Sequence, residues 1–258
     1  MERLRSKLPN EMNDIFLSIA TVTKDDPVGL ERTLISAKAL RVIGAEHLVI
    51  DGGIDLETTR RIAAEAGGGI TIIPRPPNGI ADAFNAGLAA ACGKWLWFLN
   101  GGDRIDPRLE PNFLGTLLKK TKAEMIIGGL TYEGEAEPRP HPPSHKRWPA
   151  VSTWIPHPAT LVRRRMFERY GGFDERYRIA MDYEWWLRAL GSKVSVDVLS
   201  LPFAVFAPGG ISQRPEMRRI IRREKLRAIL RHCISISGQL ARQRVRTLFS
   251  KNTMHSLF

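Results

Sequence analysis

The feature that most restricts the fold of this chain is a regular alternation of apolar, β-branched segments with helical segments between residues 15 and 134. Apolar β-branched runs predict strands, here at 15–23, 46–53, 69–77, 94–100 and 123–134. Apolar residues at helical spacing predict helices at 29–40, 57–66, 80–92 and 107–120. Strands that alternate with helices in this way indicate right-handed βαβ units and a mostly parallel central sheet.

Residues 135–149 interrupt the alternation with a Pro-rich, basic and irregular segment, which we interpret as a loop over the sheet edge. Ordered patterns then return: a short strand at 159–163, a helix to Tyr170, a Gly-Gly turn, a helix at 182–190 and a strand at 194–206. With 258 residues, the chain is long enough for one large α/β domain or two small ones.

The composition is typical of a soluble globular protein, with 43% hydrophobic and 26% charged residues. No apolar run approaches the ~18 residues that a membrane span needs, and the polar start lacks the apolar core of a secretory signal. Cys92 and Cys233 form no CxxC pair. These features favour a reducing cytoplasm as the location of the protein.

Positive charge is concentrated at the C-terminal end. Twelve of the 39 Lys and Arg residues follow residue 213, against only two of the 27 acidic residues, so this segment carries most of the net charge of +12. A helix is predicted at 214–235. Its apolar residues form a broken stripe, because Met217, Ile220 and Ile221 point away from the face of Leu226, Ile229, Leu230 and Cys233. Three interpretations stay open: a solvated basic helix, a surface for anionic lipid, and a nucleic-acid site, for which RNP aromatics and zinc ligands are missing.

Polar residues follow the predicted parallel strands at their carboxyl ends, where such sheets bind ligands. Asp51 ends the second strand, the turn at 75–79 follows the third, and Asn100-Gly101-Gly102-Asp103 follows the fourth. A single carboxylate presented on two glycines is either a simple turn or a place where a phosphate group approaches the backbone. All three segments are expected to meet at one edge of the sheet.

Six segments occur together in an order that resembles family-2 glycosyltransferases of the GT-A fold: "LSIATVT", "VIDGG", "NGIADAFNAG", "WFLNGGD", "GGFDE" and "MDYEWWLR". More narrowly, they look like the bacterial branch that builds colanic-acid-type exopolysaccharide or lipopolysaccharide sugars. The resemblance covers roughly residues 15 to 212. It implies an α/β, Rossmann-like GT-A domain at 1–213, with a nucleotide-binding half at 15–133 and an acceptor-side half at 150–213. Residues 214–258 form a basic helical extension outside it.

The resemblance implies an inverting transfer of a sugar from a nucleotide-sugar, UDP- or GDP-linked, to a hydroxyl of a glycan or polyprenyl-diphosphate-linked acceptor. Such an enzyme would work in the cytoplasm or at the cytoplasmic face of the inner membrane. The chemistry needs a hard cation, Mg²⁺ or Mn²⁺, for the departing diphosphate and a carboxylate to deprotonate the acceptor. Two alternatives are a sugar nucleotidyltransferase and a non-catalytic basic scaffold for membrane or nucleic acid.

On the donor side, the resemblance assigns the metal and the diphosphate to Asp103, with Asn100, Gly101 and Gly102 beside it. Asn100 and Gly102 stand where relatives have acidic residues, so the predicted metal site is lean, which Mg²⁺ tolerates because it keeps several waters. Asp51 is expected to contact the nucleoside, although a helix-capping role is the simpler alternative. Thr21, Asn78 and Asp82 are expected to border the nucleotide, although Asp82 could merely complement a helix dipole.

On the acceptor side, the resemblance makes Asp182 the catalytic base. Glu184 is the rival, because it lies on the same helix half a turn away. Arg188 is expected to pair with Glu184 at the favourable i, i+4 spacing. His157 is a candidate contact for the acceptor or a phosphate, with a purely structural role as the alternative.

Overall fold

The computed structural model describes residues 15–134, 155–190, 192–237 and 245–248. The segment predicted as a loop at 135–149 lies outside these residues. The strands are β1 (Leu17–Thr23), β2 (Glu46–Asp51), β3 (Ile70–Pro74), β4 (Trp95–Asn100), β5 (Arg104–Ile105), β6 (Met125–Tyr132), β7 (Thr160–Arg163), β8 (Val196–Phe206) and β9 (Val245–Leu248). The helices are α1 (Pro27–Ser36), α2 (Lys38–Val42), α3 (Leu56–Glu65), α4 (Ile80–Ala90), α5 (Pro111–Lys120), α6 (Arg164–Tyr170), α7 (Met181–Leu190) and α8 (Arg218–Ser237).

The strands form one mixed sheet in the order β3-β2-β1-β4-β7-β6-β8-β5, and β9 pairs with β8. β1 to β4 are parallel, as the βαβ pattern predicts. β7 runs antiparallel to both β4 and β6, and β5 runs antiparallel to β8. β8 runs parallel to both β6 and β9, so antiparallel pairing is limited to the contacts of β7 and β5 among the described strands. The α/β fold class with a mostly parallel sheet is therefore confirmed.

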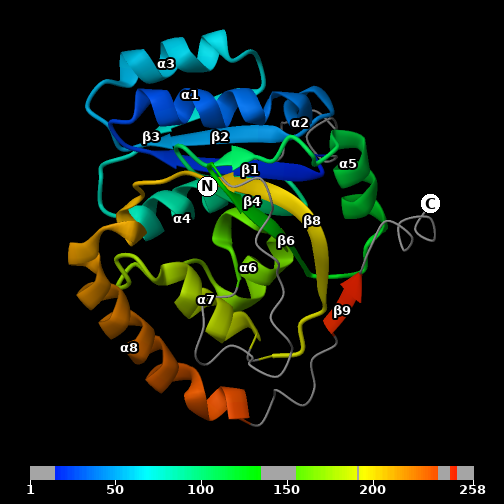
Figure 1. Cartoon of the computed structure of the whole chain (residues 1–258), viewed down its shortest axis with the longest axis vertical. Coiled ribbons are helices and arrows are strands. Elements are labelled where there is room, and N and C mark those ends of the chain that lie inside the picture. Colours follow the sequence, from blue (N-terminus) through cyan, green and yellow to red (C-terminus); the bar gives the residue numbers. More distant parts are fainter. Residues whose placement is uncertain (1–14, 135–154, 191, 238–244, 249–258) are drawn as a thin grey trace, which may run out of the picture.

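Helices cover both faces of the sheet (Figure 1). α1, α2, α3 and α5 pack on one face, and α4, α6 and α7 pack on the other. The side chains of β4 alternate between the two cores: Trp95 and Trp97 pack with α5, and Leu96 and Phe98 pack with α4 and α6. A strand buried on both faces reads as a continuous apolar run, and this explains the "WLWFL" sequence.

Helix boundaries differ from the sequence prediction at two places. The helix predicted at 29–40 is two helices, α1 and α2, which meet at Ala37. Asp26 caps α1 by accepting a hydrogen bond from the Gly29 amide at 2.8 Å. The helix predicted from Pro107 begins instead at Pro111, because residues 107–109 form a turn before it.

Strand register brings the predicted site segments to one edge of the sheet. Thr23 pairs with Asp51 across β1 and β2, and Val22 pairs with Asn100 across β1 and β4. β7 is antiparallel to β4, so β7 begins at the edge where β4 ends. A 3₁₀ turn, η4 (His157–Ala159), comes directly before β7 and thus lies at this same edge.

α8 packs against α7, on the outer side of the molecule (Figure 1). Two members of the apolar stripe identified in the sequence, Leu226 and Leu230, are 56% and 69% exposed. Ala228 and Glu224 face inward instead and are almost completely buried. Among the described residues, no helix is both long enough and apolar enough to cross a lipid bilayer.

Candidate active site

Asp51 lies at the end of β2 and is almost completely buried. Its Oδ1 atom accepts a hydrogen bond from the Gly53 amide at 2.7 Å. Its Oδ2 atom is buried and has no hydrogen-bond partner within the described part of the chain. A buried carboxylate oxygen without a donor is costly, so Oδ2 marks a place where a ligand hydroxyl or N–H group would fit.

Asp25 supports the loop that follows Asp51. It is the one described non-glycine residue with a positive φ, at 51°, and its Oδ1 atom accepts a hydrogen bond from the Ile54 amide at 2.9 Å. Uncommon backbone conformations of this kind cluster at ligand sites. Sequence reasoning missed Asp25, although an Asp-Asp pair directly after a strand is a signal that could have pointed to it.

The Asn100–Asp103 segment forms a tight turn that is fixed by α1. The amide of Gly101 donates to the carbonyl oxygen of Val22, and the amide of Gly102 donates to the hydroxyl of Thr33 at 2.9 Å. The Thr33 hydroxyl also lies 2.7 Å from the carbonyl oxygen of Asp103. Both glycine amides are therefore used inside the protein. The glycines are needed for the turn itself, since Gly102 has a φ of 102°.

The Asp103 carboxylate is surrounded by neutral hydrogen-bond donors. Oδ2 accepts from the backbone and the side-chain amide of Asn100, at 3.2 and 3.1 Å, and Oδ1 accepts from the Ala207 amide at 3.3 Å. Only 2% of the residue is exposed. Burial raises the pKa of Asp103 to about 6, and the hydrogen bonds only partly oppose this shift.

The surroundings of Asp103 fit a divalent cation only if groups other than the protein supply most of the ligands. Asp103 has a buried negative charge with no cationic partner recorded among the described residues, and this is a charge that a metal ion would neutralise. The described residues contain no cluster of three His, Cys, Asp or Glu side chains that could hold a metal. Asp103 can thus supply one oxygen, and phosphate oxygens and waters must supply the rest, as is common for Mg²⁺.

Asp82, predicted to border the nucleotide, forms a bidentate ion pair with Arg75. Its two oxygens accept from Arg75 Nη2 at 2.6 Å and Arg75 Nε at 2.9 Å. This pairing lowers the pKa of Asp82. Arg75 follows β3, and its side chain is 42% exposed, whereas that of Asp82 is only 8% exposed. The solvent-facing group of this pair is therefore the Arg75 guanidinium. Sequence reasoning missed Arg75, whose position after a parallel strand was the available signal.

Two other predicted donor-side residues differ in exposure. Asn78 is exposed in the turn before α4, and its amide donates to the carbonyl oxygen of Pro76. Thr21 is fully buried, and its hydroxyl lies 2.8 Å from Nε2 of His47. The side chain of Thr21 thus lies in the packing inside the protein, two residues before the end of β1, and its contact with the nucleotide stays a prediction.

His157 lies inside an aromatic cage. Its ring packs against Phe84, Phe98, Phe173 and Trp186, with ring centroids 5.1 to 6.4 Å away. Both ring nitrogens and the indole nitrogen of Trp186 are buried without hydrogen-bond partners among the described residues. Burial lowers the pKa of His157, and the charge of Asp182 opposes this shift. His157 is therefore a neutral ring near Asp182.

Asp182 is the second residue of α7 and is partly exposed. Its Oδ1 atom accepts a hydrogen bond from the Tyr183 amide at 2.7 Å. Lys225 of α8 also belongs to this neighbourhood, since its ammonium lies 5.4 Å above the Tyr183 ring and its pKa is affected by the charge of Asp182. The charge of Asp182 therefore acts on two groups, His157 at the edge of the sheet and Lys225 on α8.

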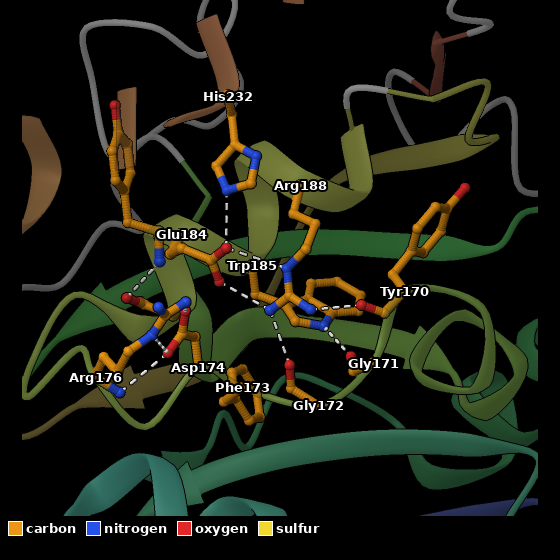
Figure 2. Close-up of polar contacts among 12 residues, drawn as sticks. Tyr170, Gly171, Gly172, Phe173, Asp174, Arg176, Glu184, Trp185, Arg188 and His232 are labelled. Atoms are coloured by element: carbon orange, nitrogen blue, oxygen red, sulfur yellow. Dashed lines mark hydrogen bonds and ion pairs between the residues drawn. The ribbon is translucent and has the colours of Figure 1, made fainter. Parts of the chain in front are cut away.

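Glu184, the rival to Asp182, is already occupied. Its carboxylate forms a bidentate ion pair with Arg188, at 2.8 and 3.1 Å, and this confirms the predicted i, i+4 pair. His232 of α8 lies 2.8 Å from Glu184 Oε1. Figure 2 shows that Arg188 continues to the carbonyl oxygens of Tyr170 and Gly172. Glu184 therefore connects α7 to a turn and to α8, with no free oxygen directed at a substrate.

The turn at 171–174 connects the two halves of the site. Asn85 on α4 donates to the carbonyl oxygen of Phe173 at 2.9 Å and accepts from its amide at 2.8 Å. The indole nitrogen of Trp185 donates to the carbonyl oxygen of Gly171 at 2.8 Å (Figure 2). α4, which begins on the donor side, is in this way fixed to α7, which carries Asp182.

Comparison with known proteins agrees with this geometry. The profile of the family described as "Glycosyl transferase family 2" matches residues 18–185, well over half of the chain. The chain belongs to glycosyl transferase family 2. The family match begins in β1 and ends in α7, so it includes both the donor-side edge and Asp182. α8 lies beyond it.

Relatives of this family-2 glycosyltransferase are found in Mycobacterium tuberculosis. An uncharacterized glycosyltransferase from strain CDC 1551 / Oshkosh is 33% identical over 178 residues, which cover 67% of this chain and 68% of that protein. Its counterpart in strain H37Rv matches equally well.

Solved structures of S. aureus TarS share the fold. The 1–349 fragment matches with a TM-score of 0.62 at 15% identity, and its complex with UDP-GlcNAc matches with a TM-score of 0.64 at 16% identity. Each match covers 86% of this chain, and 68% and 69% of the respective TarS chains. This likeness confirms a GT-A-like α/β fold.

Proposed function

We propose that this family-2 glycosyltransferase transfers a sugar, with inversion, from a UDP- or GDP-linked donor to a hydroxyl of a glycan or polyprenyl-diphosphate-linked acceptor. The observation that supports this most strongly is that Asp51, Asn100–Asp103 and the His157 turn meet at one edge of the sheet. UDP and UDP-GlcNAc are bound in solved TarS complexes, and this makes a UDP-sugar the first donor to test.

Asp182 is the proposed base. Inversion needs a carboxylate that accepts the proton of the acceptor hydroxyl as its oxygen attacks the anomeric carbon, while the bond from that carbon to the diphosphate breaks. Asp182 is partly exposed, and its second oxygen, Oδ2, accepts no hydrogen bond from the described part of the chain. Glu184 is not proposed, because Arg188 and His232 hold its carboxylate.

Asp103 is the proposed protein ligand for Mg²⁺ or Mn²⁺, since family members generally use a divalent metal. Such a cation would offset the negative charge that builds up on the departing diphosphate. The contribution of the chain is a single preformed carboxylate, oriented by Asn100 and Ala207.

Asp51 and Arg75 are the proposed contacts for the nucleotide. The unpartnered Oδ2 of Asp51 is an acceptor suited to a ribose hydroxyl or a base N–H group. Arg75 is connected to Asp51 through the backbone, with the Arg75 amide donating to the Asp51 carbonyl oxygen at 2.8 Å. Asp82 would then act indirectly, by orienting the Arg75 guanidinium.

The acceptor is proposed to belong to bacterial surface polysaccharide synthesis of the colanic-acid or lipopolysaccharide type. The basic segment 214–246 is proposed to bring the enzyme to an anionic membrane surface at the cytoplasmic face. The exposed side of α8 supports this proposal, because Arg219, Arg222, Arg223, Leu226 and Leu230 all point away from the protein. Arginines beside exposed leucines suit a lipid headgroup layer better than they suit nucleic acid.

Titration of UDP with and without Mn²⁺ tests the donor half of the proposal. We expect Mn²⁺ to strengthen UDP binding, Asp103→Ala to remove that strengthening, and Arg75→Gln to weaken binding about tenfold in both conditions. Arg60→Gln, an exposed arginine on α3, is the matched control and should bind like the wild type. Identical curves for Asp103→Ala and the wild type would contradict the metal assignment.

A product with retained anomeric configuration by proton NMR would contradict inversion.

A further inference from the structure

The inner face of α8 carries a carboxylate that is buried against the start of α7. Glu224 is only 4% exposed, although it lies on the most basic segment of the chain. Its Oε1 atom accepts a hydrogen bond from the Arg178 amide at 2.7 Å. Its Oε2 atom accepts from the amides of Ile179 and Ala180, at 3.0 and 2.8 Å.

These three amides belong to the residues immediately before α7, which begins at Met181. The start of a helix leaves backbone N–H groups without acceptors, and a Ser, Thr, Asp or Asn at the N-cap usually supplies one. Ala180 stands at this position and has no side chain that can do so. Of the three amides, only that of Ala180 belongs to the unpaired N–H groups at the start of α7, and the other two belong to the segment that leads into the helix. Glu224 therefore caps α7 at this one amide, from another helix, and also fixes the segment before it. Its negative charge suits the positive end of the helix dipole.

Further contacts hold α8 against the same region. His232 lies 2.8 Å from Glu184 Oε1 on α7, as Figure 2 shows. Arg231 forms an ion pair with Asp174 at 2.8 Å, in the turn that precedes α7. α8 thus contacts α7 and the segment before it at several positions along the helix, which include residues 224, 225, 227, 231 and 232.

We infer that Glu224 is a positioning residue for Asp182: by capping α7, it fixes the helical turn that carries the base. This inference rests on the proposed function, because it takes Asp182 as the base. It also means that α8, which lies beyond the family match at 18–185, is part of the catalytic unit.

The physical reason is geometric. A base must lie within hydrogen-bond reach of the proton that it removes, and displacement of a catalytic group by about 1 Å can cost roughly 100-fold in rate. Asp182 is only two residues from the amides that Glu224 holds, so loss of the cap would loosen the first turn of α7. The donor side, built on β1, β2 and β4, has no contact with Glu224 among those described, and it should be unaffected.

The test compares Glu224→Ala and Glu224→Gln with Glu216→Gln, an exposed acid at the start of the same segment. We expect kcat for sugar transfer to fall about 10- to 100-fold in Glu224→Ala and by less in Glu224→Gln, which keeps one oxygen acceptor. The Kd for UDP should stay within about twofold of the wild type in both, and Glu216→Gln should match the wild type. A kcat that does not change, or a kcat and a UDP affinity that fall together with the melting temperature, would overturn the inference.

Amide hydrogen exchange separates this inference from the proposed function. In Glu224→Ala, the amides of residues 178–180 should exchange faster, while those of α4 should keep their protection. If the wild type transfers no sugar, the proposed function fails, but loss of protection at 178–180 would still support the cap. Unchanged protection at these three amides would overturn the cap whatever the activity.

Discussion

Two buried carboxylates, one on each side of the candidate site, are treated in opposite ways by the protein. Asp103 and Glu184 are 2% and 1% exposed. Glu184 contacts Arg188 and His232, and these contacts lower its pKa despite burial. Asp103 contacts only neutral donors, and burial raises its pKa to about 6. A charge that the protein neutralises is part of the scaffold, whereas a charge that it leaves unmatched is available for a ligand.

The two buried carboxylates therefore have different roles: Glu184 stabilises the fold, whereas Asp103 is available to bind a ligand. On the acceptor side, Glu184 holds α7, α8 and the 170–172 carbonyl groups together. On the donor side, Asp103 is held by hydrogen bonds but not neutralised. Replacing each carboxylate by its amide should therefore affect stability in opposite directions as the pH rises.

The largest effect on stability is expected for Glu184→Gln. Removing one member of a buried ion-pair network typically costs 3 to 5 kcal/mol, so we expect the free energy of unfolding to fall by about 3 kcal/mol at pH 7. Because the folded-state pKa of Glu184 is lowered, its contribution is present above the ordinary value of 4.5 and is lost as the pH falls below it. Urea denaturation at pH 7 and pH 4 measures this. A loss below about 1 kcal/mol at pH 7 would contradict the scaffold role.

The opposite sign is expected at Asp103. Its folded-state pKa, about 6, is above the ordinary 3.8, so the folded protein holds this proton more tightly than the unfolded chain does. The wild type should therefore lose stability relative to Asp103→Asn as the pH rises from about 4 to about 7, by up to about 3 kcal/mol. The comparison of the two proteins at each pH removes any constant effect of the substitution. A difference that does not change with pH would show that Asp103 is not a destabilising charge.

A smaller effect is expected on the outer face of α8. Each arginine near an anionic surface contributes about 1 kcal/mol, so the loss of two in Arg222→Gln/Arg223→Gln should weaken binding to phosphatidylglycerol vesicles roughly 30-fold. Arg60→Gln/Arg61→Gln on α3 removes the same charge from another exposed helix and should leave vesicle binding unchanged. Equal losses in both double variants would show that only net charge matters, and tighter binding to RNA than to vesicles would favour a nucleic-acid partner.

The donor side could be predicted from the sequence because its geometry is local. Each of β1, β2 and β4 ends in a short polar turn, and parallel register alone brings Asp51 and Asn100 to the same edge. The sequence did not show that the side chain of Thr21 is directed into the packing, toward His47. Arg75 was missed because its role depends on its ion pair with Asp82, and the sequence pattern does not predict that pair.

The acceptor side could be predicted only in part, because its geometry depends on long-range contacts. The Glu184–Arg188 pair follows from helical spacing and was predictable. The orientation of α8 was not, because the pattern of its apolar residues does not show which face packs against the protein. Leu226 and Leu230 face outward because the opposite face carries Glu224, whose three backbone contacts lie more than 40 residues away in the sequence. One buried carboxylate thus determines which side of α8 meets the protein.

The central claim is that a donor site and a base on α7 act on one sugar. The most direct test of this claim measures sugar transfer and donor binding together in Asp182→Asn. General-base catalysis contributes about 10²- to 10⁴-fold, so kcat should fall by that factor while the Kd for UDP stays within about twofold of the wild type. Transfer at the wild-type rate by Asp182→Asn would contradict the account.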